Sequence, residues 1–276
     1  MPWFPDFIGA AELARRQARI EAAQADPVRQ YFAALEQGDA WLLESLWPGE
    51  VVVFDPRGGE IRGQEQLRSF VSGNRSWLAE RGTWIEAVAA TTVDGRAVME
   101  MLAHMDGDRA DLAWPVAVVA ESPDESSVVF RTYCSQWPVA GRREIRPPIL
   151  PGGADRPGDV VGRYHAALEA GDVDAVVDTF ATDGYYREPI GSTNDHRGTT
   201  ELRSYFATQL DGGGVGLECC EVTDDGVRCA LEYNCVRWGG QDLTPQAGLG
   251  VYERGPDGRL AAVRVYDDVE PPLVRT

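Results

Sequence analysis

The sequence contains no lysine, so all 26 basic residues of this 276-residue chain are arginine. Schiff-base catalysis and phosphate loops that depend on a lysine are therefore excluded. Histidine occurs three times, as His104, His165 and His196, without metal-ligand spacing. Neither a Gly-x-Ser-x-Gly elbow nor a Gly-x-Gly-x-x-Gly turn before a helix is present. We expect neither a metal ion nor a cofactor.

Long apolar runs are also lacking, since no stretch of about 18 apolar residues could span a membrane. The first six residues do not resemble a secretory signal. The net charge of −18 repels nucleic acid and anionic lipid. The five cysteines have no Cys-x-x-Cys spacing and are expected to be reduced core residues. These features predict a cytoplasmic protein that binds neither nucleic acid nor membrane.

The chain repeats itself. Residues Val28–Asp39 match Val161–Asp172 at an offset of 133 residues. The offset becomes 135 where Arg62-Gly63 matches Arg197-Gly198, and it returns to 133 at Arg131 and Arg264. A repeat of about 130 residues has the size of a domain, so the sequence predicts a duplicated domain.

Each repeat has the same order of predicted elements. A helix ends at a glycine, a second helix follows an aspartate cap, and a short strand ends at an acidic residue before proline. After a third helix, Val-, Tyr- and Trp-rich segments alternate with Asp-Gly turns, as in an antiparallel meander. We expect an α+β fold with helices packed on a curved, mainly antiparallel sheet in each domain. The predicted parts are a helical arm (1–25), domain 1 (26–145), a linker (146–158) and domain 2 (159–276).

The acidic residues before proline, Asp55 and Glu188, are candidate general bases. Proline keeps the preceding residue extended, which would set the carboxylate at the mouth of the concave sheet. Half-burial there would raise its pKa and suit it to accept a proton. Tyr31 and Tyr164, on the inward face of each first helix, would add a hydroxyl. The alternative is that the acids start loops and the tyrosines fill the core.

Around Tyr164, the segments Arg187–Ser192 and Leu202–Phe206 make the sequence resemble the bacterial ketosteroid isomerases of the SnoaL-like, NTF2-like superfamily. The resemblance covers residues 26–140 and 159–270. It implies two cone-shaped domains packed as an internal pseudo-dimer. It also implies that Glu188 or Asp55 moves a proton between carbon atoms, while Tyr164 or Tyr31 binds the developing enolate. The residues expected to bind substrate are Tyr186, Tyr205, Phe206, Val265 and Gln246.

The sequence departs from that family at its second oxyanion-binding acid. That position falls near Gly250, and near Ala117 in the first repeat, and neither side chain can donate a hydrogen bond. Losing one such donor costs about 10²–10³ in rate. Asp267 is a new acid where the family tends to have an apolar residue, and its counterpart is Cys134. It is either a donor in the pocket or a solvent-facing neighbour of Asp268.

The tandem arrangement is also similar to epoxide hydrolases that cyclise polyether antibiotics. That resemblance implies acid pairs, Asp55 with Glu86 and Glu188 with Glu218, although the two glutamates could instead be exposed strand residues. We therefore expect a cofactor-free acid–base enzyme, an isomerase or cyclase, acting on an apolar polycyclic or polyketide-like molecule. The alternatives are an epoxide hydrolase and a non-catalytic binding or scaffold protein.

Overall fold

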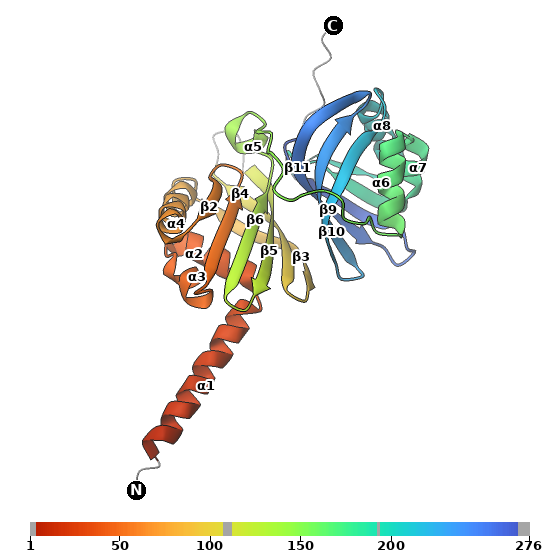
Figure 1. The fold of residues 1–276 in the computed structure, drawn as a ribbon. Coiled ribbons are helices and arrows are strands. Elements are labelled where there is room, and N and C mark those ends of the chain that lie inside the picture. The colour runs from red at the N-terminus through yellow and green to blue at the C-terminus, as the bar shows by residue number, and fades with distance from the viewer. Residues whose placement is uncertain (1–3, 107–111, 192–193, 270–276) are drawn as a thin grey trace.

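The computed structural model describes residues 4–106, 112–191 and 194–269, which form two α+β domains in tandem (Figure 1). The first domain contains helices α1 (Phe4–Gln24), α2 (Pro27–Gln37), α3 (Trp41–Leu46), α4 (Gln64–Ala79) and α5 (Trp137–Ala140), and strands β1 (Glu50–Asp55), β2 (Gly59–Arg62), β3 (Trp84–Val93), β4 (Arg96–Met105), β5 (Leu112–Asp124) and β6 (Ser127–Tyr133). The second contains helices α6 (Val160–Ala170), α7 (Val173–Asp178) and α8 (Gly198–Gln209), and strands β7 (Phe180–Arg187), β8 (Asp195–Arg197), β9 (Val215–Asp224), β10 (Arg228–Trp238), β11 (Gln241–Arg254) and β12 (Leu260–Tyr266). The predicted fold class is confirmed.

The two sheets have the same strand order, β2-β1-β6-β5-β4-β3 and β8-β7-β12-β11-β10-β9. The predicted meander of antiparallel strands is present, and each sheet adds one parallel pair, β1 with β6 and β7 with β12. Because of this pairing, the strand that leads to the acid–proline dipeptide is second from the edge of its sheet, beside the last strand. Residues near the ends of both strands can therefore meet at one site.

Local sequence fixes how the first helices lead into the sheet. Helix α6 ends at Gly171, whose φ of 72° is a left-handed conformation that suits glycine. The Asp172 side chain then accepts a hydrogen bond from Ala175 N at 3.0 Å and begins α7. In the first domain, Gly38 ends α2 in the same way, with a φ of 69°. The predicted helix ends and caps are thus present in the second repeat. In the first repeat the cap position is Ala40, one residue after the predicted Asp39, whose carboxylate accepts a hydrogen bond from Trp41 N at 3.0 Å.

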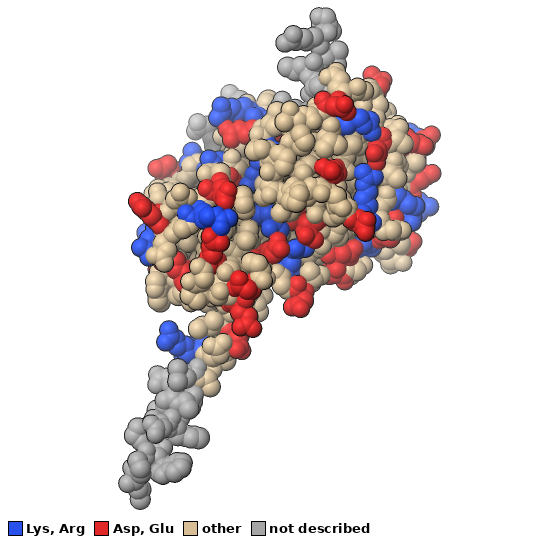
Figure 2. Space-filling model, viewed as in Figure 1, with Lys and Arg blue, Asp and Glu red and all other residues tan. Residues whose placement is uncertain are grey.

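The sheets face each other and the helices cover the outer faces, while α1 projects away from both domains (Figure 1). The predicted arm, residues 1–25, contains α1. No helix in the described ranges combines the length and the hydropathy needed to cross a membrane. On the face in Figure 2, acidic side chains are scattered over both domains among arginines. We propose the domain boundaries predicted above, which agree with the absence of helix and strand in residues 141–159.

An apolar cluster joins the two sheets. It consists of Val98, Ala117, Val119, Tyr133, Ala230, Ala247, Leu249, Val251 and Tyr266. Register places Ala117 opposite Tyr133 and Leu249 opposite Tyr266. Ala117 is therefore equivalent to Leu249 and not, as the sequence offset suggested, to Gly250. The offset is 132 in these strands, a shift that the sequence comparison missed.

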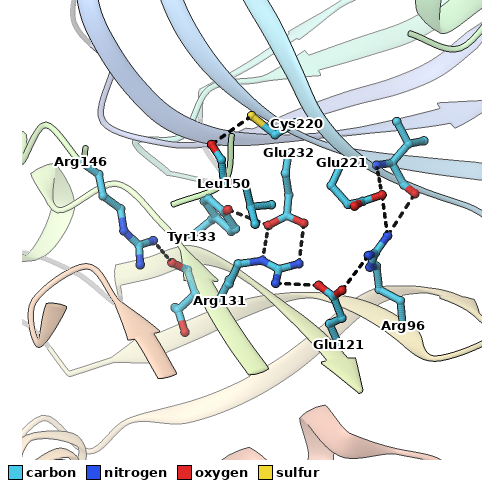
Figure 3. Close-up of polar contacts among 11 residues, drawn as sticks. Arg96, Glu121, Arg131, Tyr133, Arg146, Leu150, Cys220, Glu221 and Glu232 are labelled. Carbon is cyan, nitrogen blue, oxygen red and sulfur yellow. Dashed lines mark hydrogen bonds and ion pairs between the residues drawn. The ribbon is translucent and has the colours of Figure 1, made fainter. Parts of the chain in front are cut away.

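Two buried ion pairs cross the interface beside this cluster. The guanidinium of Arg131 contacts the carboxylate of Glu232 at 2.6 Å, and the hydroxyl of Tyr133 donates to the same carboxylate at 2.7 Å (Figure 3). Equivalent contacts in the reverse direction join Arg264 and Tyr266 to Glu100, again at 2.6 and 2.7 Å. Contacts that recur with the domains exchanged are the mark of a two-fold relation. The domains form an internal pseudo-dimer.

Candidate active site

Glu188 lies directly after β7, where the strand gives way to Pro189. Its backbone N–H donates to Asn194 O at 3.1 Å, which closes the intervening loop. Its carboxylate lies 2.7 Å from His196 Nε2, and the His196 ring stacks on Tyr205 with centroids 4.1 Å apart. The imidazole therefore holds the Glu188 carboxylate in place from the loop side.

Glu188 lines a cavity between the helices and the concave face of the second sheet. The cavity measures about 910 Å³, counting its open mouth. Aromatic and aliphatic side chains dominate its wall. The lining residues are Arg143, Tyr164, Leu168, Tyr186, Glu188, Pro189, Tyr205, Phe206, Gln209, Leu210, Val215, Leu217, Tyr233, Cys235, Trp238, Tyr252, Val265, Asp267 and Val269.

Asp267 follows β12 and is the second carboxyl group in this cavity. It is buried; its carboxylate accepts a hydrogen bond from the Tyr233 hydroxyl and another from Val269 N at 3.1 Å. Burial raises the pKa of Asp267 to about 6, although these hydrogen bonds act in the opposite direction. A carboxyl group with this pKa can gain or lose a proton near neutral pH.

Tyr164 lines the same cavity from α6. Its ring contacts those of Phe180, Phe206 and Tyr252, with centroids 5.6 to 6.3 Å apart. Burial raises the pKa of its hydroxyl well above the usual value. The group therefore stays protonated and can donate a hydrogen bond.

Tyr205 lies close to both acids. Burial raises the pKa of its hydroxyl, and the negative charges of Glu188 and Asp267 raise it further. The cavity thus brings together two carboxyl groups in different environments with neutral tyrosine hydroxyls. Such a set can take up a proton at one position and donate a hydrogen bond or proton at another.

The first domain has a smaller cavity of about 570 Å³, counting its mouth. Tyr31 and Asp55 both line it, but the Asp55 carboxylate accepts hydrogen bonds from Arg57 N and Gly58 N at 2.9 and 2.8 Å. Cys134 lies where the second domain has Asp267. Among the described residues that line this cavity, Asp55 has no second carboxylate beside it.

Three predicted site residues lie outside both cavities. Leu217 lines the second cavity, so Glu218, the next residue on the strand, points to the other face. Ile85 and Glu86 have the same relation in the first domain, and Glu86 contacts His104 Nε2 at 2.7 Å. The predicted acid pairs with Glu86 and Glu218 are therefore not assembled. Gln246 is buried on β11 but does not line the second cavity.

The other predicted substrate-binding residues, Tyr186, Tyr205, Phe206 and Val265, line the second cavity. Sequence reasoning missed Tyr233, His196 and Arg143. Alternation along β10 could have suggested Tyr233, and His196 is near Glu188 in the chain. Arg143 has no such signal because it belongs to the segment that follows the first domain's sheet.

Comparison with known proteins matches residues 161–263 to the SnoaL-like domain family. A putative polyketide cyclase from Sinorhizobium meliloti is 22% identical, covering 38% of this chain and 92% of its own, with a TM-score of 0.32. SalBIII, an epoxide hydrolase/cyclase-like enzyme in pyran ring formation of the polyether salinomycin, is 23% identical, covering 39% and 86%, with a TM-score of 0.34. A protein from Catenulispora acidiphila with a ketosteroid isomerase-like fold is 18% identical, covering 41% and 88%, with a TM-score of 0.34. The match to the SnoaL-like domain family thus covers residues 161–263, which lie in the second of the two tandem α+β domains.

Proposed function

We propose that the second domain is a cofactor-free acid–base enzyme, an isomerase or cyclase, for an apolar polycyclic or polyketide-like molecule. One observation carries the proposal: Glu188 and Asp267 line one aromatic cavity in different environments, the first held by His196 and the second buried. Two carboxyl groups whose surroundings differ in this way can divide the roles of base and hydrogen-bond donor.

In the proposed reaction, Glu188 removes a proton from a carbon atom next to a carbonyl group of the ligand. The electron pair moves to the carbonyl oxygen, which receives hydrogen bonds from the hydroxyl of Tyr164 and from protonated Asp267. An apolar ligand that excludes water favours that protonated form of Asp267. Protonated Glu188 then returns the proton to a different carbon, which completes an isomerisation. Alternatively, the enolate attacks a second carbonyl, whose oxygen takes the proton from Glu188 as the ring closes.

Epoxide opening is the second candidate, because the same two acids could perform it. Glu188 would take the proton of an attacking hydroxyl group, and Asp267 would protonate the epoxide oxygen as the carbon–oxygen bond breaks. Here Asp267 takes the role that the sequence had suggested for Glu218. A substrate deuterated at the carbon next to the carbonyl group separates the two reactions: isomerisation breaks this carbon–deuterium bond and should be slowed, whereas epoxide opening leaves the bond intact.

We expect Glu188→Gln to abolish turnover while changing ligand affinity by less than about tenfold, because the amide keeps the shape of the side chain but cannot accept a proton at neutral pH. Asp55→Asn is the matched control in the first domain and should leave turnover unchanged. Binding and turnover would be measured on both variants, starting from a panel of polycyclic ketones and hydroxy-epoxides.

The Asp55→Asn control also tests which of the two domains holds the active site. Loss of turnover in Asp55→Asn alone would move the active site to the first cavity. If all proteins bind a ligand normally and none converts it, the domain is a binding module and the enzymatic proposal is wrong.

A further inference from the structure

The segment that follows β6, residues 135–144, belongs to the first domain but is held by the second. A single buried carboxylate, that of Asp268, accepts hydrogen bonds from Ser135 Oγ at 2.5 Å, Gln136 N at 2.7 Å and Glu144 N at 2.8 Å. These donors lie at the two ends of the segment. Asp268 therefore fixes both its beginning and its end.

Arg143, at the end of this segment, reaches the second cavity. Its guanidinium donates from Nη1 to Val269 O at 2.7 Å, and its side chain forms part of the wall that also contains Asp267 and Glu188. The consecutive residues 267–269 therefore each make a different contact. Asp267 faces its own domain's cavity, Asp268 holds the segment from the other domain, and Val269 accepts from the arginine that the segment carries.

We infer that Arg143 is a positioning residue of the second cavity, by which the first domain completes the site and controls the charge of Asp267. This inference rests on the proposed role of Asp267. It assigns a function to the fused first domain beyond packing: it supplies a cation to a wall that the second domain otherwise builds.

The groups around Asp267 support this assignment. Tyr233 and Cys235 face it from β10, Tyr252 from β11 and Tyr205 from α8, and the adjacent carboxylate of Asp268 repels its charge. None of these neighbours carries a positive charge.

Arg143 is the positively charged residue of the cavity wall, and its charge favours the ionised form of Asp267. Burial is the main cause of the raised pKa of Asp267, Asp268 adds to it, and the positive charge of Arg143 lowers it. Removing that charge should therefore raise the pKa of Asp267 further.

The test is a titration of the Asp267 carboxyl carbon by NMR in the full-length protein, with the signal assigned by its loss in Asp267→Asn. We expect Arg143→Gln to raise the pKa of Asp267, because the positive charge of the arginine lowers it. Arg143→Lys keeps the charge and should restore the original pKa. Arg142→Gln is the matched control, since Arg142 is exposed and pairs with Glu144 at 2.6 Å, and it should change nothing.

An unchanged pKa in folded Arg143→Gln would overturn the inference. Arg143→Met, which keeps the apolar stem, provides the same measurement if the glutamine variant does not fold. A raised pKa in a protein that turns over no substrate would leave the inference standing and count against the proposed function. Where turnover is measurable, the pH limb assigned to Asp267 should move by the same amount as the NMR pKa.

Discussion

Burial of Asp267 suits its proposed role as a hydrogen-bond donor but lowers the stability of the folded protein when the carboxyl group ionises. Its folded-state pKa of about 6 lies above the ordinary value of 3.8, so the folded protein binds this proton more tightly than the unfolded chain. Its favourable contribution is complete below about pH 3.8 and is lost as the pH rises through 6. At pH 8, holding the ionised group in the cavity costs on the order of 3 kcal/mol, at about 1.4 kcal/mol per pKa unit.

We therefore expect Asp267→Asn to stabilise the protein at pH 8, by up to about 3 kcal/mol, and to give no comparable gain at pH 4. The asparagine carbonyl can still accept the hydrogen bond from Tyr233. Urea unfolding at both pH values measures the effect, with the exposed Asp211→Asn as control. A loss of stability of equal size at both pH values would contradict the assigned pKa.

At the residue scale, the sequence predicts which residues line a cavity better than it predicts which side chains interact. The repeat points to Tyr164 and Glu188, and both lie on the wall of one cavity. The resemblance to epoxide hydrolases implied Glu86 and Glu218 as partner acids, but strand alternation turns both side chains to the opposite face of the sheet. Arg143 could not be predicted, because its place depends on how two domains pack.

At the scale of elements, the segment containing α5 is held by hydrogen bonds to Asp268 more than by its own helix, which has four residues. We expect Asp268→Ala to lower the free energy of unfolding by about 3 kcal/mol, because it leaves the buried N–H of Gln136 and the N–H of Glu144 without their acceptor. Hydrogen exchange of these two amides should accelerate with it.

Asp242→Ala, at an exposed position on β11, is the control for that variant. If Asp268→Ala is as stable as the control and the two amides keep their protection, the segment is held by packing alone.

Elements with local signals were predicted well. Glycine caps, aspartate caps and Asp-Gly turns are encoded within a few residues, and the helices and hairpins follow them. The parallel pairing of first and last strands has no local signal, since it joins residues about 80 apart, such as Val51 and Val128. The offset between the repeats changes to 132 in β4 and β5, and the sequence gives little sign of this change. These strands share few identical residues with β10 and β11, so the change is found only from the strand register.

At the scale of the whole molecule, the interface combines an apolar cluster with two buried ion pairs (Figure 3). Removing one partner of a buried pair typically costs about 3–5 kcal/mol, because the other charge stays in the low-dielectric interface. We expect Glu232→Gln and Glu100→Gln to destabilise the protein by similar amounts in this range, since they occupy equivalent positions. Chemical denaturation of both variants measures this.

Glu221→Gln is the matched control, because Glu221 contacts Arg96 at 2.9 Å on the more exposed rim of the same interface. Exposed pairs contribute about 0–1 kcal/mol. If only one of the two buried variants loses much stability, the two ion pairs have equivalent positions but do not contribute equally to the free energy of unfolding.

The contact between Ser135 and Asp268 has a consequence for the history of the chain. The two residues are 133 positions apart, so they are the same position in the two repeats, and each is the other's partner. In a homodimer of unfused copies, a residue on the two-fold axis must meet its own twin. Copies of the second repeat would bring two aspartates together there, and copies of the first would bring two serines. A serine facing an aspartate at this point requires two different sequences, supplied by two genes or by one fused gene. Within one fused chain the two repeats can differ at this position, so that Asp268 of the second repeat accepts a hydrogen bond from Ser135 of the first.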